Sequence, residues 1–221
     1  MKTLLEPQLR ALLQENGIRV VPWRQAATAE EAVEAAGELG YPLVMKIVSP
    51  DIVHKSDAGG VILGLKDPEE VYLAFQQVEE NARAYCPEAE LGGVLLSPQL
   101  KGQTEVIVGA LYDAQFGPAI MVGLGGVFVE VFRDVAFDLA PVSEKQAEAM
   151  LRSLKAWPIL EGTRGKQGIH IPALCRLISA VSHFVSSYPV AELDLNPVFC
   201  DHQQALVGDA RLLWRQENTI C

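Results

Sequence analysis

The segment from Lys46 to Gly60 combines a lysine inside an apolar stretch with a polar loop that ends in two glycines. Lys46 lies within PLVMKIV, where burying an ammonium ion is costly unless it meets a negative partner. Two interpretations are open. Lys46 is an edge-strand residue whose ammonium reaches solvent, or it lies on a cleft wall and contacts phosphate.

The loop SPDIVHKSDAGGV contains three residue types that are suited to phosphate chemistry: glycine, lysine and histidine. The amides of Gly59 and Gly60 can approach a phosphate closely, because glycine has no side chain to obstruct them. Lys55 could add a point charge, and His54 could carry a phosphoryl group as a nucleophile. A flexible surface loop is the alternative, and the residue pattern alone does not decide between them.

Hard oxygen ligands gather near the end of the chain, in ELDLNPV and VGDARL. Glu192, Asp194 and Asn196 alternate along a predicted strand, so they share one face. We expect Asp209 on the neighbouring strand. Mg²⁺ prefers carboxylate, amide, phosphate and water oxygens, so this face could hold it. A solvated polar face of a sheet is the alternative.

A second glycine-rich turn occurs in GLGGVFVEV, at Gly123, Gly125 and Gly126. It joins two predicted strands, so it is neither a Walker A loop nor a dinucleotide fingerprint, and a tight β-connection explains part of its role. Glu130 projects from the strand that we predict after this turn. Glu105, in TEVIVGA, could face the same cleft or point outward from a sheet edge.

The elements that must position these residues form a small α/β lobe in the first part of the chain. A leucine stripe predicts a helix that ends at Gly17, and Thr28 with Glu31 forms a capping box for a second helix. Asp67 and Pro68 begin a third helix. The predicted strands are Ile18 to Val21, Leu43 to Ile47 and Val61 to Leu65.

From residue 93 onward, closely spaced strands favour antiparallel pairing. We place an N-terminal helix and small lobe at residues 1–95 and a C-terminal lobe at 96–221. Ser143 with Gln146 caps one helix of this second lobe, and Pro172 opens another. The predicted strands are Gly93 to Ser97, Thr104 to Tyr112, Ala119 to Leu124, Val127 to Phe132, Val135 to Leu139, Glu192 to Cys200 and Ala205 to Asp209.

The composition restricts the class of protein. The chain has 221 residues, 49% of them hydrophobic, a formal net charge of −10 and a sequence pI of about 4.9. Such acidity disfavours nucleic acid as the main partner. The four cysteines lack C-x-x-C or metal spacing, and no run is apolar enough for a signal peptide or membrane span. We therefore expect a cytoplasmic protein with reduced thiols.

Three segments together resemble the ATP-grasp domain of the nucleoside-diphosphate-forming acetate–CoA ligase family. They are PLVMKIVSPDIVHKSDAGGV, TEVIVGALYDAQFGPAIMVGLGGVFVEVFRDVAFDLAP, and AELDLNPV with GDARL. They occur in the family's order and cover most of residues 20 to 212. The resemblance implies an α/β (α+β) ATP-grasp fold, in which two lobes enclose a nucleotide cleft and the second lobe is mostly an antiparallel sheet.

The resemblance also implies roles for individual residues. Lys46 matches the lysine on nucleotide phosphates, and His54 matches the histidine proposed as a phosphoryl carrier in this subunit. Glu130 lies beside the transferred group. The remaining expected contacts are Lys55, Gly59 and Gly60 on the phosphate side, Ser97, Gln99 and Leu100 near the adenine hinge, Glu105 at the nucleotide, and Asn196 and Asp209 as Mg²⁺ ligands.

The implied reaction is acyl-CoA + ADP + phosphate in balance with acid + CoA + ATP, with ATP or ADP and Mg²⁺ bound. The chain has no CoA-binding domain, so the resemblance implies a CoA-binding α subunit, as αβ or α₂β₂, or a fused chain of which this is a part. The initial Met1 favours a separate β subunit, and TRGKQGIH matches the family only at Arg164-Gly165. Two alternatives remain: an ATP-grasp part of a protein-acetyltransferase-type fusion, and a non-catalytic adenine-nucleotide sensor.

Overall fold

The computed structural model describes residues 4–126, 134–163 and 167–215. Contacts within the chain divide it into two compact units, each described separately below. The smaller unit comprises Leu5–Pro7 and Val21–Lys101, and the larger unit includes Gln8–Val20 and the described residues from Gly102 onward. This division falls after Lys101, whereas the sequence placed the lobe boundary at residue 95, and it assigns most of the first helix to the larger unit.

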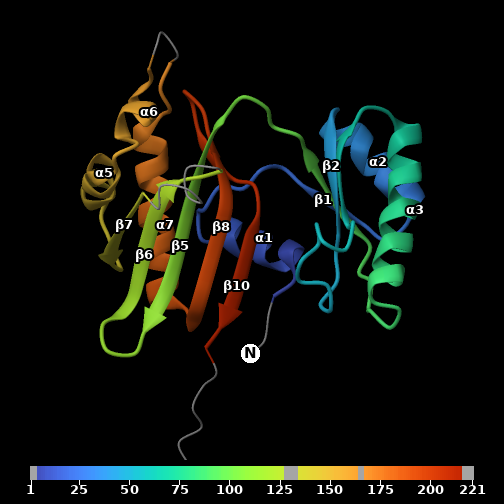
Figure 1. The fold of residues 1–221 in the computed structure, drawn as a ribbon, viewed down its shortest axis with the longest axis horizontal. Coiled ribbons are helices and arrows are strands. Elements are labelled where there is room, and N and C mark those ends of the chain that lie inside the picture. Colours follow the sequence, from blue (N-terminus) through green and yellow to red (C-terminus); the bar gives the residue numbers. More distant parts are fainter. Residues whose placement is uncertain (1–3, 127–133, 164–166, 216–221) are drawn as a thin grey trace, which may run out of the picture. The chain divides into compact units, whose positions relative to one another are not determined.

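The smaller unit is an antiparallel sheet with helices against one face (Figure 1). Its strands follow the order β1-β4-β2-β3, so β2, which carries Lys46, is an interior strand. Figure 1 shows α2 and α3 side by side on the sheet. The elements are β1 (Arg24–Ala26), α2 (Ala29–Leu39), β2 (Leu43–Ile47), β3 (Val61–Leu65), α3 (Pro68–Tyr85) and β4 (Val94–Pro98).

Alternation along β2 and β4 separates the helix-covered core of this sheet from its opposite face. Leu43, Met45 and Ile47 join Val94 and Leu96 in the hydrophobic core beneath the helices. The residues between them, including Lys46 and Ser97, therefore point to the other face. Strand register places Lys46 opposite Leu95 and Val44 opposite Ser97, so these positions are neighbours on that second face.

The predicted N-caps of the smaller unit are confirmed, but Glu31 does not complete the predicted capping box, because its carboxylate accepts from the amide of Ala27. Thr28 accepts a hydrogen bond from the amide of Glu31 (3.2 Å), and Asp67 accepts one from Glu70 (2.8 Å). The strand predicted at Ile18 to Val21 is wrong, because that segment contributes only an isolated bridge from Val20 to Val207. Buried apolar residues there mimic a strand, and the pairing strand β1 starts after Pro22 instead.

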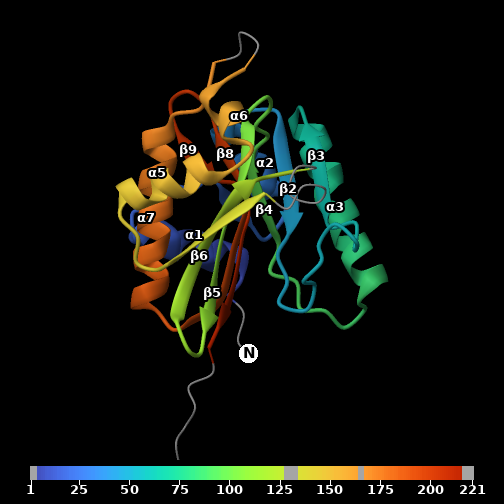
Figure 2. The same ribbon diagram turned by 60° about the vertical axis from the view of Figure 1, so that its left-hand side comes forward.

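The larger unit is a second antiparallel sheet, whose order is β10-β8-β5-β6-β7 with β9 paired to β8. Helices α5 and α7 lie against one side of it (Figure 2). The strand predicted at Val127 to Phe132 and the segment Arg164-Gly165 lie outside the described residues. The elements are α1 (Glu6–Glu15), β5 (Thr104–Asp113), β6 (Gly117–Leu124), β7 (Val135–Leu139), α5 (Glu144–Ser153), α6 (Trp157–Glu161), α7 (Ile171–Ser187), β8 (Val190–Cys200), β9 (Ala205–Val207) and β10 (Ala210–Trp214).

Alternation also gives this sheet a core face and an open face. Val108, Ile120 and Leu195 are fully buried on the core side. Because side chains alternate along a strand, Glu105 of β5 and Asn196 of β8 belong to the opposite, open face. The capping box of Ser143 and Gln146 is present at the start of α5, as predicted. No helix in the described ranges has the length and apolar character needed to span a membrane.

Gly93 is required where β4 begins, because its backbone adopts φ +79° and an added Cβ would lie 2.1 Å from the carbonyl oxygen of Ala26. We expect Gly93→Ala to lower the free energy of unfolding by clearly more than the ~1–2 kcal/mol cost of a left-handed conformation alone. Gly102→Ala is the matched control, since Gly102 has φ +78° and nothing within 4 Å. Denaturant titration measures both losses, and equal losses would show that Gly93 tolerates a methyl group.

Candidate functional site

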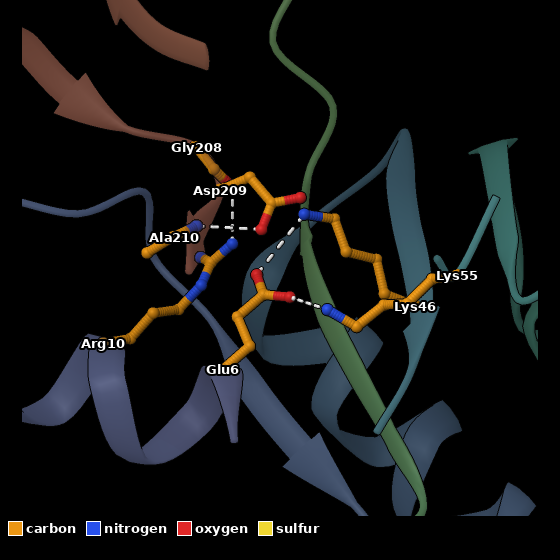
Figure 3. Close-up of polar contacts among 7 residues, drawn as sticks. All are labelled: Glu6, Arg10, Lys46, Lys55, Gly208, Asp209 and Ala210. Atoms are coloured by element: carbon orange, nitrogen blue, oxygen red, sulfur yellow. Dashed lines mark hydrogen bonds and ion pairs between the residues drawn. The ribbon is translucent and has the colours of Figure 1, made fainter. Parts of the chain in front are cut away.

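Lys46 of the smaller unit extends from β2 to an acidic partner at the start of α1 (Figure 3). Its Nζ lies 3.3 Å from Oε1 of Glu6. The Nζ of Lys55 lies 2.7 Å from Oε2 of the same carboxylate. One carboxylate thus bridges two ammonium ions, one from a strand and one from the loop that follows it.

These three charged groups are largely removed from water. The side chain of Glu6 is 3% exposed, that of Lys46 11% and that of Lys55 21%. The interpretation of Lys46 as an edge-strand lysine reaching solvent is therefore wrong, because β2 lies between β3 and β4. Buried charges need such pairing, because an unpaired buried ion costs several kcal/mol, on the order of 3–5 when one partner is removed.

The loop between β2 and β3 is held at both ends. Ile52 and Ala58 are buried in the core of the smaller unit. The amide of Gly60 donates to the carbonyl of Lys55 (2.7 Å), and the carbonyl of Gly60 accepts from Ile47 (2.8 Å). A Cβ on Gly60 would lie 2.5 Å from the Cγ2 of Ile47. This glycine therefore permits the close approach that turns the chain at Lys55.

His54 is exposed, although its neighbour Lys55 points inward to Glu6. Among the described residues its imidazole makes no hydrogen bond or ion pair, while its backbone carbonyl accepts from Ala58 (3.2 Å). The loop therefore presents the imidazole to solvent on an anchored turn. This placement suits a group that reacts with something outside the smaller unit, and the carrier role itself stays a prediction.

Ser97, Gln99 and Leu100 occupy the end of β4 and the residues after it. Ser97 is buried on the same face of the sheet as Lys46, and Leu100 is half-buried. The amide of Gln99 donates to the carbonyl of Pro42 (2.8 Å). Its side-chain Oε1 is buried without a hydrogen-bond partner among the described residues. An unsatisfied buried acceptor is costly, so a donor supplied by a ligand is one way to satisfy it.

In the larger unit, Asn196 and Asp209 lie opposite each other on neighbouring segments. The amide of Asn196 donates to the carbonyl of Asp209 (3.2 Å), in register with the β8–β10 pairing of Leu195 and Ala210. Their side chains offer amide and carboxylate oxygens, the donor types that Mg²⁺ prefers. The described residues contain no cluster of three or more His, Cys, Asp or Glu side chains arranged for a metal. The pair therefore fits a Mg²⁺ ion that takes further oxygens from phosphate and water.

Acidic groups continue along the open face of β8. Burial raises the pKa of the Asp194 carboxyl, and the nearby carboxylates of Asp209 and Glu192 raise it further. Arg211, which lies opposite Asp194 on β10, partly offsets this effect. The face around Asn196 is therefore negative, and a cation bound there would face favourable charges.

The segment before Asp209 is fixed by a buried arginine of α1. Arg10 is fully buried, and its Nη2 donates to the carbonyl of Gly208 at 2.5 Å (Figure 3). The amide of Gly208 in turn donates to the carbonyl of Pro197 (2.8 Å). Asp209 itself accepts from the amide of Ala210 (2.8 Å). These bonds set the position of the Asp209 backbone relative to the Asn196 strand.

Glu105 lies beside the second glycine-rich turn. Its carbonyl accepts from the amide of Gly125 (2.7 Å), and a Cβ on Gly125 would lie 3.0 Å from the Cβ of Glu105. Gly125 is therefore needed for this close approach. Glu130 lies outside the described residues, so its expected place beside the transferred group stays a prediction.

The two buried cysteines, Cys175 and Cys200, contribute no reactive group to the site. Burial raises the pKa of Cys175 to about 11 and that of Cys200 to about 12. Because the thiolate is the nucleophilic form, both thiols are inert near neutral pH. Cys86, Cys175 and Cys200 form no disulfide.

The sequence reasoning missed Glu6 and Arg10. Both lie on α1 among leucines, and Glu6 is spaced with buried Leu9 and Leu13 on one helical stripe. A charged residue on an apolar stripe is costly to bury. That pattern was the available signal that each residue has a specific polar partner.

Comparison with known proteins assigns residues 1–213 to the ATP-grasp domain. The chain belongs to the ATP-grasp family. Its relatives include the ADP-forming acetate–CoA ligase I subunit beta of Pyrococcus furiosus, which is 46% identical over 96% of this chain and 92% of the relative. The ADP-forming acetate–CoA ligase II of Archaeoglobus fulgidus is 44% identical over 95% of this ATP-grasp chain, which spans 30% of that longer protein.

A solved structure of acetyl-coenzyme A synthetase 1 of Ca. Korarchaeum cryptofilum has a TM-score of 0.93 and 43% identity. The match covers 97% of this chain and 94% of that one, and that structure contains coenzyme A and Ca-AMPCP. Another structure of the same synthetase contains Mg-AMPPCP, with a phosphohistidine segment that points towards the nucleotide-binding site. The ATP-grasp fold expected from the sequence is thus confirmed.

Asn81 of α3 fastens the His54 loop, because its Nδ2 donates to the carbonyl of Gly59 (2.8 Å). We expect Asn81→Ala to speed amide hydrogen exchange of residues 54–60 by about 5- to 10-fold, the equivalent of one lost hydrogen bond of ~1 kcal/mol. Gln77→Ala is the control, because Gln77 bonds only the side chain of Asn81 in this network. Unchanged exchange in the Asn81 variant would show that Ile52 and Ala58 hold the loop without it.

Proposed function

We propose that this chain is the nucleotide-binding β subunit of an ADP-forming acyl-CoA synthetase. The reaction is acyl-CoA + ADP + phosphate in balance with acid + CoA + ATP. Among the structural observations, the paired ammonium ions of Lys46 and Lys55 beside the exposed imidazole of His54 carry the proposal furthest. They give the smaller unit a positive site for phosphate next to a group that can receive a phosphoryl group.

Each expected residue has a physical role in this proposal. Lys46 and Lys55 neutralise charge on the nucleotide phosphates, because ammonium ions are strong donors to phosphate oxygens. Ser97, Gln99 and Leu100 contact the base at the end of β4. Glu105 contacts the nucleotide, and Glu130 acts on the transferred phosphoryl group. Asn196 and Asp209 hold Mg²⁺, which supplies positive charge to the phosphate oxygens when bound.

The step assigned to this chain is phosphoryl transfer between phosphorylated His54 and ADP. A terminal oxygen of the ADP β-phosphate attacks phosphorus, and a new P–O bond forms. The P–N bond to the imidazole breaks, and its electron pair returns to the ring nitrogen. Such transfers depend mainly on alignment and charge neutralisation, which suits a histidine on an anchored turn with lysines beside it.

The proposed division of labour assigns the source of the His54 phosphoryl group to a CoA-binding partner, because residues 1–213 of this chain match the ATP-grasp domain. The related subunit beta of Pyrococcus furiosus carries a subunit name, which supports a CoA-binding α partner for this chain. We propose assembly as αβ or α₂β₂, in the cytoplasm, where ADP and acyl-CoA are available. The longer relative from Archaeoglobus fulgidus supports the same division of labour within a single chain.

The alternatives are an ATP-grasp part of an acetyltransferase-type fusion and a nucleotide sensor without turnover. The relatives described above are named as ligases or a synthetase, which favours the catalytic proposal. An exposed His54 on an anchored loop also favours it, because a sensor has no use for a phosphoryl carrier.

His54→Ala tests the carrier role directly. In the chain reconstituted with its CoA-binding partner, acetyl-CoA, phosphate and MgADP, we expect ATP formation to fall by about 10³-fold or more, as when a covalent nucleophile is removed. Acid-labile labelling of the chain from γ-labelled ATP should disappear as well. His183→Ala, which alters an exposed histidine on α7, should keep both signals. Full ATP formation by the His54 variant would reject the carrier assignment.

Asp209→Asn tests the Mg²⁺ site while keeping the shape of the side chain. We expect the Mg²⁺ concentration needed for half-maximal ATP formation to rise by about 10- to 100-fold, because a charged ligand is lost. Glu192→Gln removes a charge from the same open face farther along β8, and should shift the requirement less than about threefold. Equal shifts would indicate a general effect of negative charge and not ligation by Asp209.

A further inference from the structure

The carboxylate of Glu6 contacts both lysines that the proposed function assigns to binding nucleotide phosphate. Oε1 contacts the Nζ of Lys46 at 3.3 Å, and Oε2 contacts the Nζ of Lys55 at 2.7 Å (Figure 3). A carboxylate resembles phosphate in offering anionic oxygens to such donors. Glu6 therefore already makes the kind of contact that a nucleotide phosphate would make.

The contact is built into the fold of the smaller unit. Glu6 is 6% exposed, and it begins α1 immediately before Pro7, which suits the first turn of a helix. Lys46 comes from an interior strand, and the backbone bond between Gly60 and Lys55 sets the turn that aims Lys55 inward. The three groups come from three different segments, so their meeting is not an accident of local sequence.

The charge of Glu6 determines how this contact affects an anionic ligand. Glu6 places one negative charge directly against the two ammonium ions. Each ammonium has three N–H donors, so a phosphate can still reach it while Glu6 remains near. The carboxylate repels that phosphate and competes for the same donors, and the effect is strong because the site is mostly buried.

We propose that Glu6 is an internal competitor of nucleotide phosphate, which holds Lys46 and Lys55 in the nucleotide-free protein and limits how tightly they retain phosphate. This inference rests on the proposed function, because it assumes that phosphate binds these lysines. Weaker retention of phosphate helps the reaction, because it favours nucleotide release. A reversible transfer between ADP and ATP requires that neither nucleotide is held too tightly for release.

A purely structural counter-ion would behave differently. If Glu6 only kept the lysines in place, its removal would let them separate and would weaken phosphate binding. If Glu6 competes with phosphate, removal of its charge tightens binding, even where the protein becomes less stable. The sign of the change in affinity therefore distinguishes the two roles.

The test is a graded series at Glu6, measured by calorimetric titration of the full chain. The probes are MgADP and inorganic tripolyphosphate, which reports phosphate binding without base or ribose. We expect Glu6→Gln to bind both probes about 3- to 10-fold more tightly than the wild type. Glu6→Asp keeps the charge but withdraws it by one methylene, so its affinity should lie between the two.

Glu15→Gln is the matched control, because Glu15 is exposed at the other end of α1 and its removal changes net charge equally. Its affinity for tripolyphosphate should match that of the wild type. If Glu6→Gln does not fold, Glu6→Asp alone still decides the sign. Unchanged or weaker binding by the folded Glu6 variants would overturn the proposal, as would equal tightening by Glu15→Gln.

Lys46→Ala separates this inference from the proposed function. If the wild type binds MgADP and Lys46→Ala binds it much more weakly, phosphate binding at the lysines stands, and the Glu6 series judges competition alone. If the wild type does not bind MgADP, or Lys46→Ala leaves its affinity unchanged, the nucleotide assignment itself fails.

Discussion

Lys46 places an ammonium ion on an interior strand of an apolar sheet, where little water reaches it. Leaving such an ion unpaired would cost several kcal/mol, against a total stability of about 5–15 kcal/mol for a typical domain. The carboxylate of Glu6, 40 residues earlier in the chain, supplies a partner. The start of α1 and the course of the β2–β3 loop are both constrained by this requirement.

Glu6 also pairs with Lys55, and this second ion pair separates two adjacent loop residues into different environments. Lys55 turns inward to the second oxygen of Glu6, while His54 is left exposed. Ile52 and Ala58 are buried on either side of the turn and anchor it to the core. The imidazole of His54 is therefore exposed to solvent on an anchored loop. A lysine that binds an anion and a histidine that is proposed to carry a phosphoryl group can therefore be adjacent in sequence and still face different surroundings.

Local features could be predicted from the sequence because a few neighbouring residues encode them. The caps at Thr28, Asp67 and Ser143 are of this kind. The three-residue strand β1 could not be predicted, because it is too short to show an alternation of apolar and polar residues. It forms by pairing with β4. The buried segment before it has the apolar composition of a strand but forms only one bridge.

The expected site residues were found through residue type and resemblance, but the partners that fix them were not. Glu6 meets Lys46 across 40 residues, and Arg10 meets Gly208 across 198. No local pattern encodes such separations. Each of the two α1 residues nevertheless places a charge in a leucine-rich helix, and burying that charge without a partner would be unfavourable. A buried charge in an apolar helix therefore indicates a distant polar anchor, even where the sequence cannot identify it.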